Sequence, residues 1–501
     1  MSQIGYSLDD NIHYIKESLG YSNDIVIREV VLNSSEPVRA AVLYADGMVD
    51  SYLVQAVLID SLLYKTRLKE WVREDEEFIP FLKESVLSVG DMGDLFDFPT
   101  LFTALLSGCV IILVEGCAQG IHIGLQEWKD RGVTEPSSQT VIRGPRESFT
   151  ETLRTNITLL RRRISNEKLW IEVNRIGEET NTEVAIVYMK GIVEEGVVEE
   201  VRKRLERIRV DGIMESGMIE ELIQDEAYTP FPTIANSERP DVVAANLLEG
   251  RVAILVDGTP FVLTVPSLFV EFFHSAEDYY QRFDFSTLIR MLRFACFFIA
   301  LLAPSLYIAI TTFHQEMLPT QLLISLAAQR EGVPFPAFVE AIMMEVAFEI
   351  LREAGIRMPR AVGQAISIVG TLVIGQAAVE AGIVSAAMVI VVSITAISSF
   401  IFPASNMSIT VRILRFPLMV MAASFGIYGI IVGMLVLVLH LCSLRSFGVP
   451  YMESFAPFSL KEQRDTILRM PIWALDKRPE SITKNNLRRQ STGNKPLPPE
   501  K

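Results

Sequence analysis

The chain has 501 residues, a formal net charge of −15 and a hydrophobic content of 50%. This apolar content excludes a largely disordered chain, and the acidic balance argues against a nucleic-acid-binding protein, whose binding domain would be basic. The mean hydropathy is +0.30, yet 21% of the residues are charged. A chain combines both properties when a charged part and a very apolar part occupy different regions.

The first 285 residues read as a soluble α/β region with an internal repeat. Leu-Leu-Ser-Gly at 105–108 and Leu-Leu-Glu-Gly at 247–250 each precede an apolar strand, 142 residues apart (247 minus 105). The strands at 38–47 and 182–191 repeat at a similar spacing and are bounded by turn residues. We therefore expect two similar subdomains, each with the order helix, strand, strand, helix, strand, although chance similarity of short strands stays open. Their expected bounds are 1–135 and 145–285, joined near 136–144.

Three consecutive arginines, Arg161, Arg162 and Arg163, fall on a helix expected to begin after Pro145. One interpretation is a solvated basic face. The other is a contact with anionic lipid head groups or with an acidic surface of a partner subunit.

Residues 290–444 are predicted to form an all-α membrane domain. A helix needs about 20 apolar residues to cross a bilayer, and four stretches are uncharged over such a length. Four such stretches in about 150 residues indicate a polytopic membrane protein. The expected spans lie near 294–313, 361–379, 385–403 and 416–440.

Basic residues flank this region on both sides. Arg282, Arg290 and Arg293 precede the first span, and the polar tail 445–501 contains 11 Lys and Arg against 6 Asp and Glu. Because positive flanks favour the cytoplasm, both terminal regions are expected there, which requires an even number of crossings. Four crossings fit the apolar stretches, and six remain possible. Arg412 and Arg415 would fall outside in the four-span arrangement, which counts against it.

An apolar helix expected near 334–354 carries an acidic stripe. Glu345, Glu349 and Glu353 follow at intervals of four residues and therefore share one helix face. The helix is amphipathic or re-entrant. Its acidic face either lies in water at the membrane interface or lines a water-filled vestibule that attracts cations.

The second expected span has a polar face formed by Gln364, Ser367 and Thr371. Such residues allow membrane helices to pack closely, or they line a polar pore, and both interpretations stay open. In the pore interpretation the apolar neighbours Ile368 and Leu372 could close the throat by excluding water.

The sequence contains no recognisable catalytic or metal-binding motif. Its five histidines form no zinc-binding spacing, and no phosphate-binding or nucleophile motif is present. We therefore expect no enzymatic activity, no cofactor and no metal.

Several long segments resemble the A subunit of GerA-type spore germinant receptors. They include RGPRESFTETLRTN at 143–156, PFPTIANSERPDVVAANLLEGR at 230–251, EAGIRMPRAVGQAISIVG at 353–370 and RMPIWALDKRP at 469–479. The resemblance covers nearly the whole chain.

This resemblance implies a multi-pass protein of the spore inner membrane. Its expected partners are a transporter-like B subunit, which is the expected site of nutrient recognition, a lipoprotein C subunit, membrane lipid and further copies of the chain. The A subunit would form a ring, with five copies expected, and act as a nutrient-gated cation channel that triggers germination. A non-conducting scaffold subunit and a secondary transporter are the alternatives; a transporter would show inverted repeats, and none is found in the spans.

Overall fold

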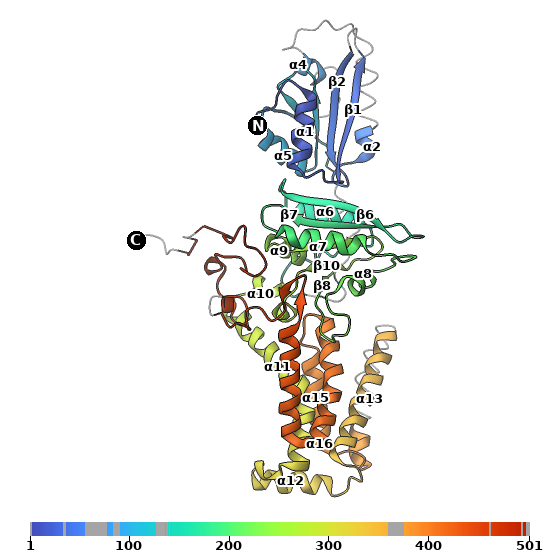
Figure 1. The fold of residues 1–501 in the computed structure, drawn as a ribbon, viewed down its shortest axis with the longest axis vertical. Helices are drawn as coiled ribbons and strands as arrows, with labels where there is room; N and C mark the ends of the chain where they lie inside the picture. Colours follow the sequence, from blue (N-terminus) through green and yellow to red (C-terminus); the bar gives the residue numbers. More distant parts are fainter. Residues whose placement is uncertain are drawn as a thin grey trace.

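The computed structural model describes residues 3–33, 37–55, 78–83, 91–126, 136, 139, 141–358, 375–459, 462–491 and 494–496. Two α/β units lie one above the other, and a bundle of long helices extends from the second unit (Figure 1). The C-terminal tail returns to the side of the second unit, at its junction with the bundle. The expected order of an α/β region followed by a helical region is therefore confirmed.

The first α/β unit is built on a five-stranded antiparallel sheet with the strand order β1-β2-β4-β5-β3. Helices α1 and α5 pack on one face through Leu8, Ile15, Leu101 and Leu105. The elements are α1 (Leu8–Ser18), β1 (Ile25–Asn33), β2 (Pro37–Ala45), α2 (Ser51–Leu53), α4 (Phe78–Phe81), β3 (Met92–Leu95), α5 (Phe98–Leu106), β4 (Cys109–Val114) and β5 (Gly120–Gly124).

The second unit has a five-stranded antiparallel sheet with the order β6-β7-β9-β10-β8. Helices α6 and α9 cover one face, and α7 and α8 cover the other. The elements are α6 (Leu153–Arg163), β6 (Leu169–Ile176), β7 (Thr182–Met189), α7 (Glu195–Glu206), α8 (Ser216–Ile223), β8 (Ala235–Ser237), α9 (Pro240–Leu248), β9 (Val252–Val256) and β10 (Val262–Val265).

The two sheets share one strand order, and their central strands also share a register. Ala40 of β2 pairs with Val114 of β4, and Val184 of β7 pairs with Val256 of β9. These positions differ by 144 and 142 residues, the spacings found in the sequence. The expected linker at 136–144 is described only in part.

The repeat extends to buried side chains. The Asn11 carboxamide accepts a hydrogen bond from the Gly5 N–H at 2.9 Å and donates to the Gly5 carbonyl at 2.7 Å. Asn156 does the same with the backbone of Thr150, at 2.7 and 2.6 Å. Each asparagine therefore fixes the segment that leads into the first helix of its unit.

The helical region begins at the second unit. After the short elements η4 (Phe269–Phe273) and α10 (Glu277–Tyr280), helix α11 extends through 31 residues. Its central contacts are with α15 and α16, where Ile308 meets Met388 and Met419 in one apolar cluster. The elements are α11 (Phe283–Phe313), η5 (Gln315–Met317), α12 (Thr320–Arg330), α13 (Ala337–Arg357), α15 (Ala386–Ser399) and α16 (Ser405–Ser443).

Helix α16 folds back on itself at Gly426. The backbone there has φ 64° and ψ −144°, which is not helical and suits glycine. Leu418 lies against Gly433 across the turn. The two ends of α16 also meet the same loop, since Thr410 donates to the Pro230 carbonyl and the His440 ring lies 2.9 Å from the Thr229 hydroxyl.

The expected single span at 416–440 contains this non-helical glycine, so its residues form two helical segments on either side of Gly426. By length and composition, two of the described helices could cross a membrane, α11 and α16 when its two segments are counted as one helix, and α15 is shorter. The expected amphipathic helix near 334–354 corresponds to α13. Most of the expected span at 361–379 lies outside the described residues.

The C-terminal tail is packed against the second unit. It contains β11 (Arg445–Ser446), β12 (Val449–Pro450), η6 (Glu462–Arg464) and η7 (Ile472–Ala474). The Ser446 hydroxyl donates to the Thr233 carbonyl at 2.6 Å, and Arg478 Nε donates to the Leu248 carbonyl at 2.6 Å. The tail and the second α/β unit therefore lie at the same end of the helical bundle.

Candidate functional site

The predicted pore residues cannot be placed. Gln364, Ser367, Ile368, Thr371 and Leu372 all lie outside the described residues, which end at 358 and resume at 375. The acidic stripe on α13, however, is described in full.

Glu345, the first carboxylate of the stripe, is buried against α16. Its Oε2 accepts a hydrogen bond from Arg415 Nη1 at 2.5 Å, and both side chains are about 2% exposed or less. Arg415 Nε donates to the Ala300 carbonyl of α11 at 2.8 Å. This arginine therefore joins α11, α13 and α16, and its charge offsets that of Glu345.

Glu349, one turn further along, is held by two arginines. Arg412 Nη1 lies 2.7 Å from Glu349 Oε2, and Arg352 Nη1 lies 3.8 Å from Oε1. Arg352 also donates to the Ser399 hydroxyl of α15 at 2.7 Å. Its guanidinium also lies over the rings of Phe348 and Phe400, at 5.2 and 4.8 Å from their centroids.

Glu353 differs from the other two carboxylates because it is largely exposed. It pairs with Arg357 on its own helix at 2.6 Å. Within the single chain the stripe is thus not the free acidic face that its spacing suggested. Arg412 and Arg415 of α16 carry the positive charges that pair with Glu349 and Glu345. The arginines are three residues apart and the glutamates four, so each set lies on one face of its helix. These two spacings were the signal available in the sequence.

Glu340 of α13 forms a further buried contact near the far end of the bundle. Its Oε2 accepts a hydrogen bond from the Ser385 N–H at the start of α15, at 2.9 Å. Arg330 of α12 lies 3.5 Å from Oε1. Carboxylates of α13 therefore meet cationic or donor groups from α12, α15 and α16. We call the ion pairs that Glu345 and Glu349 make with Arg415, Arg412 and Arg352 the ion-pair layer.

The three arginines of α6 have separate environments. Arg161 is completely buried and forms two hydrogen bonds with Asp24 of the first α/β unit, at 2.7 and 3.0 Å. Because it is buried inside the single chain, Arg161 is not available for contact with lipid or with another subunit. Instead it joins the two α/β units. Arg163 pairs with Glu147 at 2.7 Å. Arg162, 4.0 Å from Glu147, is the more exposed of the three. For Arg162 and Arg163 the external contact stays a prediction.

A second charged cluster joins the second unit, α11 and the tail. Asp278 of α10 accepts hydrogen bonds from Arg290 at 3.0 Å and from Arg293 at 2.7 Å. Arg290 also lies 2.9 Å from Asp465 of the tail. Arg290 and Arg293, whose positive charges in the sequence indicated only topology, thus fix the start of α11 to α10 and the tail.

A duplicated α/β unit in front of an apolar helical bundle with internal ion pairs defines a class of membrane-associated protein with a large polar region at one end. Comparison with known proteins identifies this class more closely. The model of the Bacillus/Clostridium GerA spore germination protein family matches residues 13–481. The chain belongs to this family.

Two named relatives match nearly the whole chain. Spore germination protein KA of Bacillus subtilis (strain 168) is 51% identical over 99% of this chain and 90% of its own. Spore germination protein GerLA of Bacillus cereus is 40% identical over 93% of this chain and 94% of its own. The crystal structure of the N-terminal domain of the A subunit of the Bacillus megaterium spore germinant receptor GerK3 covers 54% of this chain and 98% of its own, with 37% identity and a TM-score of 0.43.

Proposed function

We propose that the chain is the A subunit of a nutrient germinant receptor in the spore inner membrane and forms an oligomeric, nutrient-gated cation channel. Family membership supports the role in germination. The transporter-like B subunit and the lipoprotein C subunit are its proposed partners. A homo-oligomeric ring, with five copies expected, would enclose the pore.

The burial of ionisable side chains in the ion-pair layer, rather than their pairing, is the observation that supports the channel proposal. Ionisable side chains inside an apolar bundle are costly and mark functional sites by default. Glu345 and Arg415 are both buried at the point where α11, α13 and α16 meet. A layer of charges that exchange partners gives the bundle two alternative arrangements, which a gate requires.

The proposed pore wall is the span expected at 361–379, which directly follows α13 in the chain. Gln364, Ser367 and Thr371 would supply polar groups to permeating cations, and Ile368 and Leu372 would exclude water in the closed state. Movement of α13 would open this throat and release Glu345 and Glu349 from their arginines. Glu353 is already exposed and would stand at the mouth.

The contacts of the tail support a topology with both terminal regions on the cytoplasmic side. Tail residues bond to the second α/β unit, and the turn at Gly426 returns the chain to that unit. An even number of crossings satisfies this arrangement, as the basic flanks require.

The test is the assembly and behaviour of the purified receptor. Electron microscopy should show a closed ring of A subunits around the span at 361–379, and Ile368→Gly should permit cation leak without nutrient. A nutrient can open the ring only by binding the open state more tightly. A monomeric A subunit within an otherwise active receptor would contradict the proposal.

A non-conducting scaffold is the second candidate, and the paired state of Glu345 and Glu349 favours it. Paired charges inside a bundle can fix helix positions without any pore. A scaffold predicts that Ile368→Gly and Thr371→Ala leave the cation permeability of the assembled receptor unchanged.

A further inference from the structure

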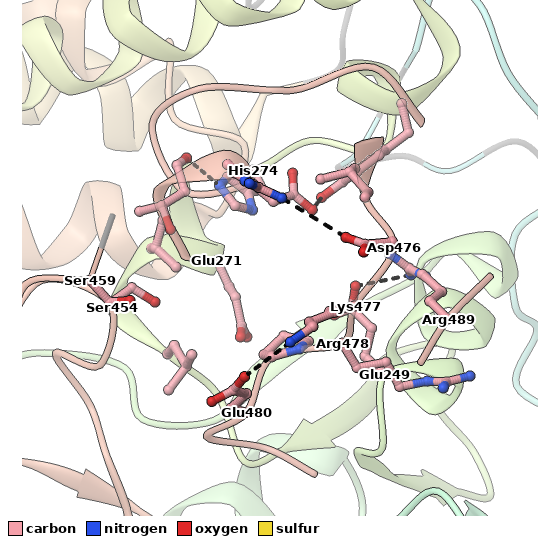
Figure 2. A pocket seen from close by; sticks show the side chains of 18 of the residues that line it. Glu249, Glu271, His274, Ser454, Ser459, Asp476, Lys477, Arg478, Glu480 and Arg489 are labelled. Atoms are coloured by element: carbon pink, nitrogen blue, oxygen red, sulfur yellow. Dashed lines mark hydrogen bonds and ion pairs between the residues drawn. The ribbon is translucent and has the colours of Figure 1, made fainter. Parts of the chain in front are cut away.

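A cavity of about 380 Å³ lies between the second α/β unit and the tail. Figure 2 shows Glu271, His274 and the tail residues Asp476, Lys477 and Glu480 around this open space. Cavities of roughly 300–1,000 Å³ are the usual size of small-molecule sites. Its walls come from segments that are about 200 residues apart in the sequence, so the cavity exists only while the tail is docked.

A second cavity of about 480 Å³ adjoins the first. The two share Glu249, Arg251, Glu271 and Arg489 among their lining residues. The second cavity also reaches Pro403, in the segment between α15 and α16, and Asn406 in the first turn of α16. A molecule bound here would therefore lie at the junction of the α/β unit, the tail and the helical bundle.

The charges around the first cavity are balanced. Five Asp or Glu and five Lys or Arg side chains line it. The inner wall holds the tightest pair, in which Arg251 Nη1 donates to Glu271 Oε2 at 2.6 Å and Nη2 donates to Oε1. Burial and the positive charge of Arg290 lower the pKa of His274, so its ring is neutral near pH 7.

The pairs at the rim are much looser than the inner pair. Lys477 and Glu480 are 3.8 Å apart, and Arg464 and Asp476 are 4.0 Å apart. A charge-assisted hydrogen bond is about 2.7–2.9 Å long. These rim side chains are between 40% and 58% exposed. They can consequently take a ligand's charged groups as new partners at little cost.

We propose that this cavity binds a small zwitterion, a molecule with one ammonium and one carboxylate group, of the class of free amino acids. A zwitterion can insert between Lys477 and Glu480, giving its carboxylate to the lysine and its ammonium to the glutamate. A singly charged ligand would make a charge-assisted hydrogen bond with only one of the two side chains, whereas a zwitterion makes two. The apolar part of the ligand would face Leu268, Val270 and Leu475.

The cavity lies on the same side of the membrane as the tail and the second α/β unit. Its occupant would hold the tail against the second unit and next to the α15–α16 segment. Such a site lets the protein respond to the metabolite content of that compartment. The inference stands independently of the channel proposal, because it concerns binding and not conduction.

The experiment measures binding to the purified full-length chain. Each common L-amino acid is added in turn while the apparent Tm is followed, and the affinity of any that binds is measured by calorimetry. At least one should raise the Tm of the parent. Lys477→Gln and Glu480→Gln should each weaken its binding by roughly 10- to 100-fold, the loss expected for one hydrogen bond to a charged group. Lys203→Gln, an exposed lysine of α7, is the matched control and should bind like the parent.

Analogues of the bound amino acid test the zwitterion requirement. The amine that lacks the carboxylate and the hydroxy acid that lacks the ammonium should each bind at least tenfold more weakly. The rim variants should keep the parent's Tm without ligand, since both side chains are more than half exposed. The inference is overturned if no amino acid raises the Tm, if both rim variants bind like the parent, or if either analogue binds as tightly.

Discussion

Asn11 and Asn156 hold equivalent backbone segments in the two α/β units, and both side chains are buried. Replacing Asn156 by alanine leaves the N–H and C=O of Thr150 without their partner. An unsatisfied buried polar group costs about 1–3 kcal/mol, so the apparent Tm of the purified chain should fall by several degrees. Asn11→Ala should act similarly. An unchanged Tm in both variants would show that these hydrogen bonds are not needed for stability.

Replacing Arg161 should destabilise the protein more than replacing its neighbour Arg162. Removing one partner of a buried ion pair costs about 3–5 kcal/mol, so Arg161→Ala should loosen the contact with Asp24 and make the joint between the α/β units sensitive to protease. Arg162→Ala is the matched control and should change stability by less than about 1 kcal/mol. Equal protease sensitivity of the two variants would contradict this role for Arg161.

Glu220 of α8 should make stability depend on pH. Burial raises the pKa of its carboxyl group to about 7, and the charge of Glu215 acts in the same direction. The folded state therefore holds this proton more tightly than the unfolded state, and stability should fall as pH rises from about 4.5 through 7. Glu220→Gln should remove up to about 3 kcal/mol of that fall. A parent and variant with parallel Tm–pH curves between pH 5 and 8 would contradict it.

Local sequence patterns predict side-chain type and periodicity better than they predict partners. The repeat in the α/β region was visible because apolar strands and Leu-Leu-x-Gly turns recur at fixed spacing, and the sheets have the same order. The burial of Arg161 was not visible, because its partner Asp24 lies 137 residues away. The stripe on α13 was found, but its pairing with Arg412 and Arg415 depends on a long-range helix contact.

At the scale of elements, α13 offers a comparison within one helix. Glu345→Gln should disturb the ion-pair layer, because it leaves Arg415 buried without its carboxylate. We expect poorer assembly or a basal cation leak. Glu353→Gln changes an exposed residue on the same stripe and should assemble and remain closed like the parent.

Exchanging the charges of Glu345 and Arg415 tests whether the two residues act as an ion pair or whether each substitution acts only at its own position. The double variant with Glu345→Arg and Arg415→Glu keeps both charges in the layer and should regain part of the lost assembly. If Glu353→Gln is as harmful as Glu345→Gln, or the swap is worse than each single change, the layer does not act as paired charges.

Helix α16 shows why apolar length alone does not give the number of helical segments. Residues 416–444 carry no Asp, Glu, Lys or Arg, so hydropathy reads them as one span. The reversal depends on a single glycine with positive φ at 426, and glycines elsewhere in the same run remain helical. Backbone conformation at one residue is not encoded in the hydropathy of its neighbours.

For the whole molecule, the docked tail predicts that both terminal regions share one side of the membrane. A cysteine introduced at Gln490 should be labelled only after the membrane is permeabilised. A cysteine at Gln321 in α12, at the opposite end of the bundle, should be labelled from outside. The native cysteines are replaced first in both variants. Labelling of position 490 from outside intact cells would contradict the topology.

The central claim is that this chain conducts cations in response to nutrient. The most direct measurement is potassium efflux from proteoliposomes that contain the purified receptor with its A, B and C subunits. Efflux should start on nutrient addition in the parent and should occur without nutrient in Ile368→Gly. Receptors that bind nutrient but release no potassium, with Ile368→Gly equally tight, would contradict it and leave the chain as a scaffold.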